Sequence, residues 1–379
     1  MKKTIIIPFL FFLIFFINAD EYKINEFGFF VDIPVGWKVV DASNPAIVSF
    51  SNQEGNAVFQ IYTFDGKTFN DSAEISDFIK TKLNAAAEEA NFTYSGRDSI
   101  IADLSFNAGQ ISVRGYAVYI NGDDYDIALI AFSPMNVYEK NYYFILSVLD
   151  SFAINREEKL SSGPINQFYY VMDEKNKRKV DIVVEGKRIH TDIDDKELEA
   201  ALVLIEREFI ILSNYKLGEN DIVKPWKRYY NTIYRDNYQR IKKVTDIVMK
   251  ELDLNNKSDE EKVKRLLKWF QNFSDARNKN IADLISPIEA IYSFTGDCDS
   301  RALLFSIILD QIGIDSIMLV STKYMHSAVA IDIKGEGAMF SFEGKNYLYA
   351  ELMDNVEIGM VPQKMADPTG WIPLKLGYK

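Results

Sequence analysis

The chain has 379 residues, more than one hydrophobic core usually holds, since cores stop growing at roughly 250–300 residues, so two or more domains are expected. Its 47% hydrophobic and 26% charged residues are those of an ordinary globular protein, which excludes wholesale disorder. The net charge of −12 leaves no basic stripe to neutralise phosphates, which excludes nucleic acid and an anionic lipid surface as partners.

Residues 1–19 have the pattern of a secretory signal peptide. Lys2 and Lys3 precede the apolar run 4–17, and Ala19 offers a small residue for cleavage. The run is short for a membrane span, so a cleaved signal is favoured over an uncleaved anchor. We therefore expect a secreted or periplasmic protein that meets a membrane only if the signal segment is retained.

The predicted elements of residues 20–155 form a compact α/β unit. A short strand precedes the stretch Ile33-Pro34-x-Gly36-Trp37, and the turn at residues 121–124 joins a predicted hairpin. The pattern predicts strands at 29–33, 46–50, 57–64, 110–120 and 125–133, and helices at 73–90 and 138–152. This order is similar to PsbP-like domains, and the resemblance implies an α/β/α sandwich that binds or scaffolds and carries no catalytic residues.

Residues 156–166 are charged and small and are predicted to be a linker to a second domain, 167–379. A strand is expected at 180–184, and helices at 198–212 and 226–252. Ser258 and Glu261 form a capping box at the start of a further helix. His190 belongs to no motif, and we interpret it as structural or exposed.

The only cysteine of the chain, Cys298, follows a turn at Gly296 and begins a helical apolar pattern that Gly313 ends. The backbone N–H groups and the dipole at a helix N-terminus favour the thiolate, the nucleophilic form of cysteine. Of the two histidines, His326 is the better base, because the alternating pattern 325–333 predicts a rigid strand around it. A second strand at 347–352 carries Glu351. Nucleophile, base and acid follow in this order.

These pieces, taken in order, resemble the transglutaminase-like superfamily of papain-type cysteine enzymes. The resemblance implies an α+β domain, with the cysteine helix packed on the strands that carry the catalytic triad of Cys298, His326 and an acid. Glu351 is favoured as the acid, whereas Asp354 and Asp367 remain alternatives. The matching pieces are Pro287 and Glu289, Gly296-Asp297-Cys298-Asp299, Gly313-Ile314-Asp315, the strand 317–320, His326-Ser327-Ala328 and Tyr347-x-Tyr349-x-Glu351.

The resemblance implies an attack of the thiol on peptide or glutamine-type amide bonds through an acyl-thioester. Hydrolysis is favoured over crosslinking, since nothing marks a site for a second, amine substrate. The expected partner is a protein or peptide substrate, with no cofactor and no metal, because Asp297 and Asp299 suit turn and capping roles better than a metal site. The alternative is an inactive secreted binding protein that keeps the fold as a scaffold.

Overall fold

The computed structural model describes residues 21–24, 27–170, 176–215 and 222–377. The expected signal segment, residues 1–19, lies outside these ranges. Among the helices within them, none combines the length and the apolar character needed to cross a membrane.

The first half is built on a seven-stranded antiparallel sheet in the order β3-β4-β5-β9-β8-β7-β6. Alternate residues of each strand serve opposite faces, so Ala117 and Tyr119 pack under α1 (Ser72–Leu83), and Val118 and Ile120 pack under α2 (Tyr138–Asp150). The two-stranded ribbon of β1 (Glu21–Ile24) and β2 (Phe29–Asp32) packs into the same apolar cluster as α2. The sheet strands are β3 (Lys38–Asn44), β4 (Ile47–Ser51), β5 (Val58–Asp65), β6 (Ala86–Tyr94), β7 (Arg97–Ala108), β8 (Ile111–Ile120) and β9 (Tyr125–Pro134).

The predicted helix at 73–90 is wrong in its second part. The helix ends at Leu83, because Asn84 adopts the left-handed conformation (φ 48°) and its N–H caps the last turn. Ala86–Tyr94 then forms β6, which pairs along its whole length with β7. Alanine and glutamate favour a helix here, and the sheet overrides that local preference.

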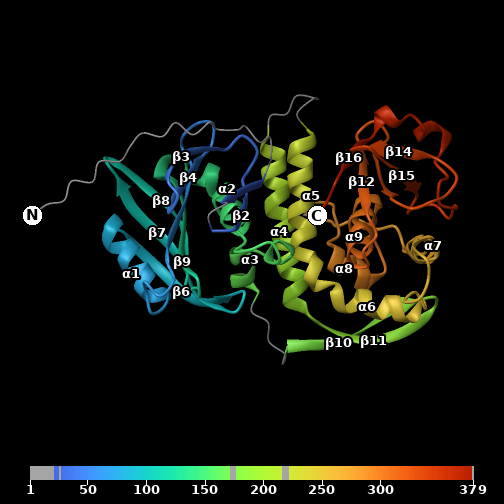
Figure 1. Cartoon of the computed structure of the whole chain (residues 1–379), viewed down its shortest axis with the longest axis horizontal. Coiled ribbons are helices and arrows are strands. Elements are labelled where there is room, and N and C mark those ends of the chain that lie inside the picture. The colour runs from blue at the N-terminus through green and yellow to red at the C-terminus, as the bar shows by residue number, and fades with distance from the viewer. Residues whose placement is uncertain (1–20, 25–26, 171–175, 216–221, 378–379) are drawn as a thin grey trace, which may run out of the picture.

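The second half packs helices against a five-stranded antiparallel sheet in the order β14-β15-β13-β12-β16. In Figure 1, α4 and α5 stand side by side between the first sheet and this one, and the ribbon of β10 and β11 runs below them. The helices are α4 (Asp195–Asn214), α5 (Val223–Arg240), α6 (Lys242–Glu251), α7 (Asp259–Phe270), α8 (Pro287–Ser293) and α9 (Cys298–Gln311). The strands are β10 (Lys177–Val184), β11 (Lys187–Asp194), β12 (Ser316–Ser321), β13 (His326–Ile331), β14 (Met339–Phe342), β15 (Lys345–Ala350) and β16 (Ile372–Leu374).

The cysteine helix α9 lies at the centre of the second core. Its apolar residues are buried all round, and it packs against β12, β13 and the helices α5 and α8. The helix expected at 226–252 is two helices, because the chain turns at Ile241 between α5 and α6. His190 is exposed on β11 and contacts Asp181 across the ribbon.

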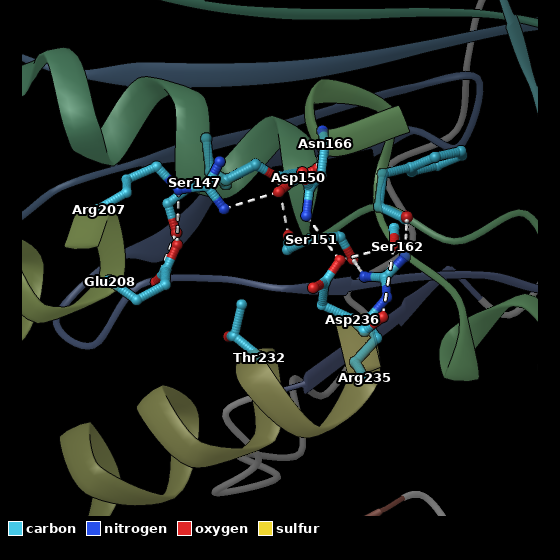
Figure 2. Close-up of polar contacts among 12 residues, drawn as sticks. Ser147, Asp150, Ser151, Ser162, Asn166, Arg207, Glu208, Thr232, Arg235 and Asp236 are labelled. Carbon is cyan, nitrogen blue, oxygen red and sulfur yellow. Dashed lines mark hydrogen bonds and ion pairs between the residues drawn. The ribbon is translucent and has the colours of Figure 1, made fainter. Parts of the chain in front are cut away.

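The segment 156–166 is folded and packed. It contains a 3-10 turn at Glu158–Leu160 and the start of α3 (Pro164–Tyr169). Ser162 Oγ and Asn166 Nδ2 each donate a hydrogen bond of 2.6 Å to Asp236 Oδ1 on α5. The segment therefore forms part of the contact between the two halves (Figure 2).

Buried charges join the sandwich to the helices α4 and α5. Arg228 on α5 donates to Glu208 Oε2 on α4 (2.8 Å) and to Ser147 Oγ on α2 (2.8 Å). Arg207 Nη2 lies 2.7 Å from Asp150 Oδ2, again between α4 and α2 (Figure 2). Burial raises the pKa of Glu208, but Arg228 and Arg207 outweigh it and hold that pKa below its usual value. These four charged side chains are at most 7% exposed, so each depends on its partners.

Candidate active site

A short turn presents Cys298 at the first residue of α9. Helix α8 ends at Phe294 in the left-handed conformation (φ 58°), and Gly296 then donates its N–H to Ser274 O (3.0 Å). Asp297 caps α9, with its Oδ1 accepting the N–H of Ser300 at 2.9 Å. The capping role predicted for Asp297 is confirmed, and Cys298 is 8% exposed.

His326 and Glu351 meet in a partly buried hydrogen-bonded pair. His326 is the first residue of β13, and its Nε2 lies 3.0 Å from Glu351 Oε2 and 3.1 Å from Oε1. Glu351 follows the last residue of β15 and is 1% exposed. The Tyr349 hydroxyl donates to Oε2 (2.8 Å), and the Met353 N–H donates to Oε1 (3.0 Å).

The contacts of Glu351 keep it ionised. Burial is the largest influence and raises its pKa, but the hydrogen bonds from His326, Met353 and Tyr349 together hold the pKa below its usual value. An ionised carboxylate on Nε2 places the ring hydrogen on that nitrogen, because a carboxylate only accepts. Nδ1 is then the basic nitrogen of the ring.

The two rival acids lie elsewhere. Asp354 is exposed, and its side chain has no hydrogen bond to His326 among the described contacts. Asp367 is exposed and accepts from Lys323 Nζ (2.8 Å) and from the Thr369 N–H (3.0 Å), which lower its pKa to about 2. The structure thus pairs His326 with Glu351.

The surroundings of the thiol differ from the sequence-based expectation. Burial raises the pKa of Cys298 most, followed by Asp299 and Asp297, and a hydrogen bond from the backbone of Ser327 only partly opposes them, so the pKa is raised to about 12. Burial and the two carboxylates thus oppose the thiolate that the helix N-terminus was expected to favour. Sγ lies 3.7 Å from Asp299 Oδ1, and within the described ranges no hydrogen bond joins it to the His326 ring.

One buried arginine ties the turn of the nucleophile to the loop of the acid. Arg301 is 2% exposed and donates to Gly296 O (2.8 Å), Phe273 O (2.8 Å) and Leu352 O (3.1 Å). Gln271 supports the same loop from α7, with its amide donating to Glu351 O (2.9 Å). Of these two residues, only Arg301 could have been singled out from the sequence, because it lies three residues after Cys298 on the predicted helix.

Aromatic and strained residues border the histidine. The Trp371 ring centroid lies 6.1 Å from that of His326, and Trp371 is 5% exposed. Met325 has φ 49°, a conformation that is costly for a residue other than glycine, and its side chain is 85% exposed directly before His326.

Metal ligands do not gather near the thiol. In the part of the chain that the structure describes, no group of three His, Cys, Asp or Glu side chains is arranged to hold a metal ion. A groove of about 550 Å³ lies between α2, α3 and α4, is lined by residues such as Tyr142, Val203 and Ile281, and is separate from the site of Cys298.

Comparisons with known proteins give weak matches. No family model and no curated protein matches the chain. Among solved structures, cyanobacterial PsbP (CyanoP) from Synechocystis sp. PCC 6803 is 14% identical, with 35% of this chain and 90% of that chain covered and a TM-score of 0.30. A protein of Bacteroides thetaiotaomicron VPI-5482 is 9% identical over 86% of this chain and 85% of that chain, with a TM-score of 0.25. LpqN, involved in cell envelope biogenesis of Mycobacterium tuberculosis, is 9% identical over 33% and 82%, with a TM-score of 0.23.

The molecule is of mixed α+β class with several sheets, as expected. None of these three structures is described as transglutaminase-like, so that resemblance stays a prediction from the sequence.

Proposed function

We propose that the chain is an exported, transglutaminase-like cysteine enzyme that cleaves peptide or glutamine-type amide bonds through an acyl-thioester on Cys298. The observation that carries the proposal is the arrangement around β13. The buried carboxylate of Glu351 bonds the Nε2 of His326, and the backbone of the next residue, Ser327, forms a hydrogen bond with the Cys298 thiol. The proposed nucleophile, base and acid come from the start of α9, the start of β13 and the residue after β15.

The proposed reaction is an acyl transfer in which Cys298 is the nucleophile and His326 the base. Nδ1 of His326 takes the thiol proton while Sγ bonds to the carbonyl carbon, and the carbonyl π pair moves to the oxygen. The backbone N–H of Cys298, at the start of α9, suits the developing oxyanion. The imidazolium, stabilised by Glu351, then gives its proton to the leaving amine, and the thioester forms. Water, activated by the same ring, completes hydrolysis.

Hydrolysis is favoured over crosslinking, and the substrate is a protein or peptide. Nothing in the sequence marks a second site for an amine. The first half of the chain, in this proposal, binds or scaffolds.

The test is an assay of two products with two substrates. Full-length mature protein is incubated with casein and with a glutamine-containing peptide, and new N-termini and free ammonia are measured. The proposal predicts product with wild type and less than about 1% of that rate with Cys298→Ala, because no other thiol is present. Equal rates for both proteins would sink it.

The alternative is an inactive binding protein that uses the same fold as a scaffold. The raised pKa of Cys298 and the absence of an Sγ–imidazole bond among the described residues favour it. It predicts that neither substrate is turned over and that Cys298→Ala leaves binding of protein partners unchanged.

A further inference from the structure

A tyrosine–carboxylate pair lies beside the candidate nucleophile and has no part in the reaction above. Tyr230, on α5, is 5% exposed, and its hydroxyl donates a hydrogen bond of 3.0 Å to Asp299 Oδ2. The other carboxylate oxygen, Oδ1, lies 3.7 Å from Cys298 Sγ, within the range of an S–H···O hydrogen bond. Asp299 therefore links a buried phenol to the thiol.

The other groups near the thiol are engaged elsewhere. Asp297 Oδ1 caps the N–H of Ser300, and its Oδ2 lies 3.9 Å from Arg277 Nε. Arg301 is directed to backbone carbonyls. The charged and titratable side chains around Sγ are Asp297, Asp299 and Arg301 from the start of α9, Arg277 from the segment before α8, Tyr230 from α5, and His326 from β13. Among them, Asp299 is the one whose oxygen contacts the sulfur.

We propose that Asp299, held in place by Tyr230, is a positioning residue that accepts the thiol hydrogen and keeps Cys298 as an oriented, neutral thiol in the resting protein. The role of Asp299 in a reaction rests on the proposed function, whereas its contacts with Tyr230 and Cys298 do not depend on that function. A negative oxygen on the sulfur favours S–H over the thiolate, and the burial of Tyr230 keeps its phenol protonated and donating. The raised pKa of Cys298 agrees with this arrangement, since Asp299 follows burial among its causes.

The consequence is a nucleophile that forms only during the reaction. The S–H bond breaks as the S–C bond forms, and the proton passes to His326 rather than residing there beforehand. A neutral thiol also resists alkylating agents and oxidants, which attack the thiolate. Such protection suits a lone thiol in the oxidising compartment that we expect for this chain.

The rate of alkylation of the folded protein by iodoacetamide, measured against pH, tests the inference. Cys298 is the only cysteine, so the label reports on it alone. Asp299→Asn removes the negative oxygen at constant shape, and we expect the midpoint of the profile to fall by at least about one pH unit, which makes alkylation about tenfold faster near pH 8. Asp299→Ser provides a second variant should the first not fold, and circular dichroism checks both.

The role of Tyr230 is tested with a double-mutant cycle that combines it with Asp299. Tyr230→Phe releases the carboxylate toward solvent, so the midpoint should fall in the wild-type background and should not change further in the Asp299→Asn background. Tyr234→Phe is the matched control, because Tyr234 lies one turn along α5 and its hydroxyl bonds Asp310 instead. Its profile should equal that of wild type.

An Asp299→Asn profile that coincides with wild type would overturn the inference, as would an equal effect of Tyr234→Phe. No substrate enters this assay, so the outcome is independent of the proposed activity. A chain without hydrolytic activity that still shows the Asp299 effect would disprove the function and keep the positioning role, and the reverse result would keep the function alone.

Discussion

Glu351 stays ionised although only 1% of it is exposed, because three donors, from His326, Tyr349 and Met353, converge on its two oxygens. That charge fixes Nε2 of His326 as a donor and leaves Nδ1 as the base. An amide in place of the carboxylate offers only one acceptor oxygen and no charge for the imidazolium.

Glu351→Gln should lower kcat/KM by about 10²–10⁴-fold, because the imidazolium formed in the reaction loses its counter-charge. Hydrolysis of casein at neutral pH measures the effect. Asp367→Asn is the matched control, since Asp367 bonds Lys323 and not His326, and should retain the wild-type rate within about twofold. A large loss in that control would move the acid to Asp367.

The same carboxylate makes stability depend on pH. Its pKa is lower in the folded chain than its usual value of 4.5, so its contribution is fully present above that pH and is lost as the pH falls through the folded value. The difference in Tm between wild type and Glu351→Gln should therefore be constant near neutral pH and shrink on acidification below about pH 4. A difference that grows toward acid would contradict the ionised assignment.

The sequence predicted Cys298 and His326 because the chain has one cysteine and two histidines. It also predicted the strand that leads to Glu351. It did not predict the contact of Asp299 with Tyr230, because Tyr230 lies on a helix 69 positions earlier in the chain. Local patterns carry no information on such a contact.

At the scale of the elements, the cysteine turn, the end of α7 and the loop after β15 are joined through Arg301. The guanidinium donates to Gly296 O, Leu352 O and Phe273 O, and a buried carbonyl that loses its donor costs stability. The geometry of the site thus depends on a residue whose hydrogen bonds go to backbone carbonyls.

Arg301→Met should lower the free energy of unfolding by more than about 3 kcal/mol, because several buried carbonyls lose their donor at once. Urea denaturation measures it. Arg265→Met is the control: Arg265 donates to Leu252 O from a half-buried position on α7, so its loss should cost less than about 1 kcal/mol. Similar losses in both variants would show that Arg301 is not the tie between these elements.

Element boundaries were predictable where a local signal marks them. Ser258 caps α7 and Gly313 ends the cysteine helix, as the sequence indicated. The helix predicted through Ala90 failed because pairing with β7 decides the state of residues 86–94, and the ribbon partner β11 was not recognised. At residues 86–94, pairing with the next strand of the chain overrides the local helix preference.

At the scale of the whole molecule, buried ion pairs join the sandwich to the helical core. Arg228, Glu208 and Ser147 are contributed by three helices, two from the second half and one from the first. No pattern in the sequence predicts this network, because its members come together only after both halves have folded. The segment 156–166 lies packed within the same contact.

The network makes the two halves depend on each other. Glu208→Gln should lower the free energy of unfolding by about 3–5 kcal/mol, since it leaves two buried arginines short of a counter-charge. Glu199→Gln, on the exposed side of the same helix, should cost less than about 0.5 kcal/mol. Calorimetry should show one transition for wild type, and a separate early transition of the first half would contradict the coupling.

The central claim is that Cys298 acts together with His326 in acyl transfer. Intact-mass spectrometry of the folded protein mixed with p-nitrophenyl acetate follows acetylation of the single thiol over time. We predict an acetyl-thioester on wild type that forms at least about 100-fold faster than on His326→Ala and then disappears by hydrolysis. Equal rates of acetylation in the two proteins, or an adduct that water never removes, would contradict the account.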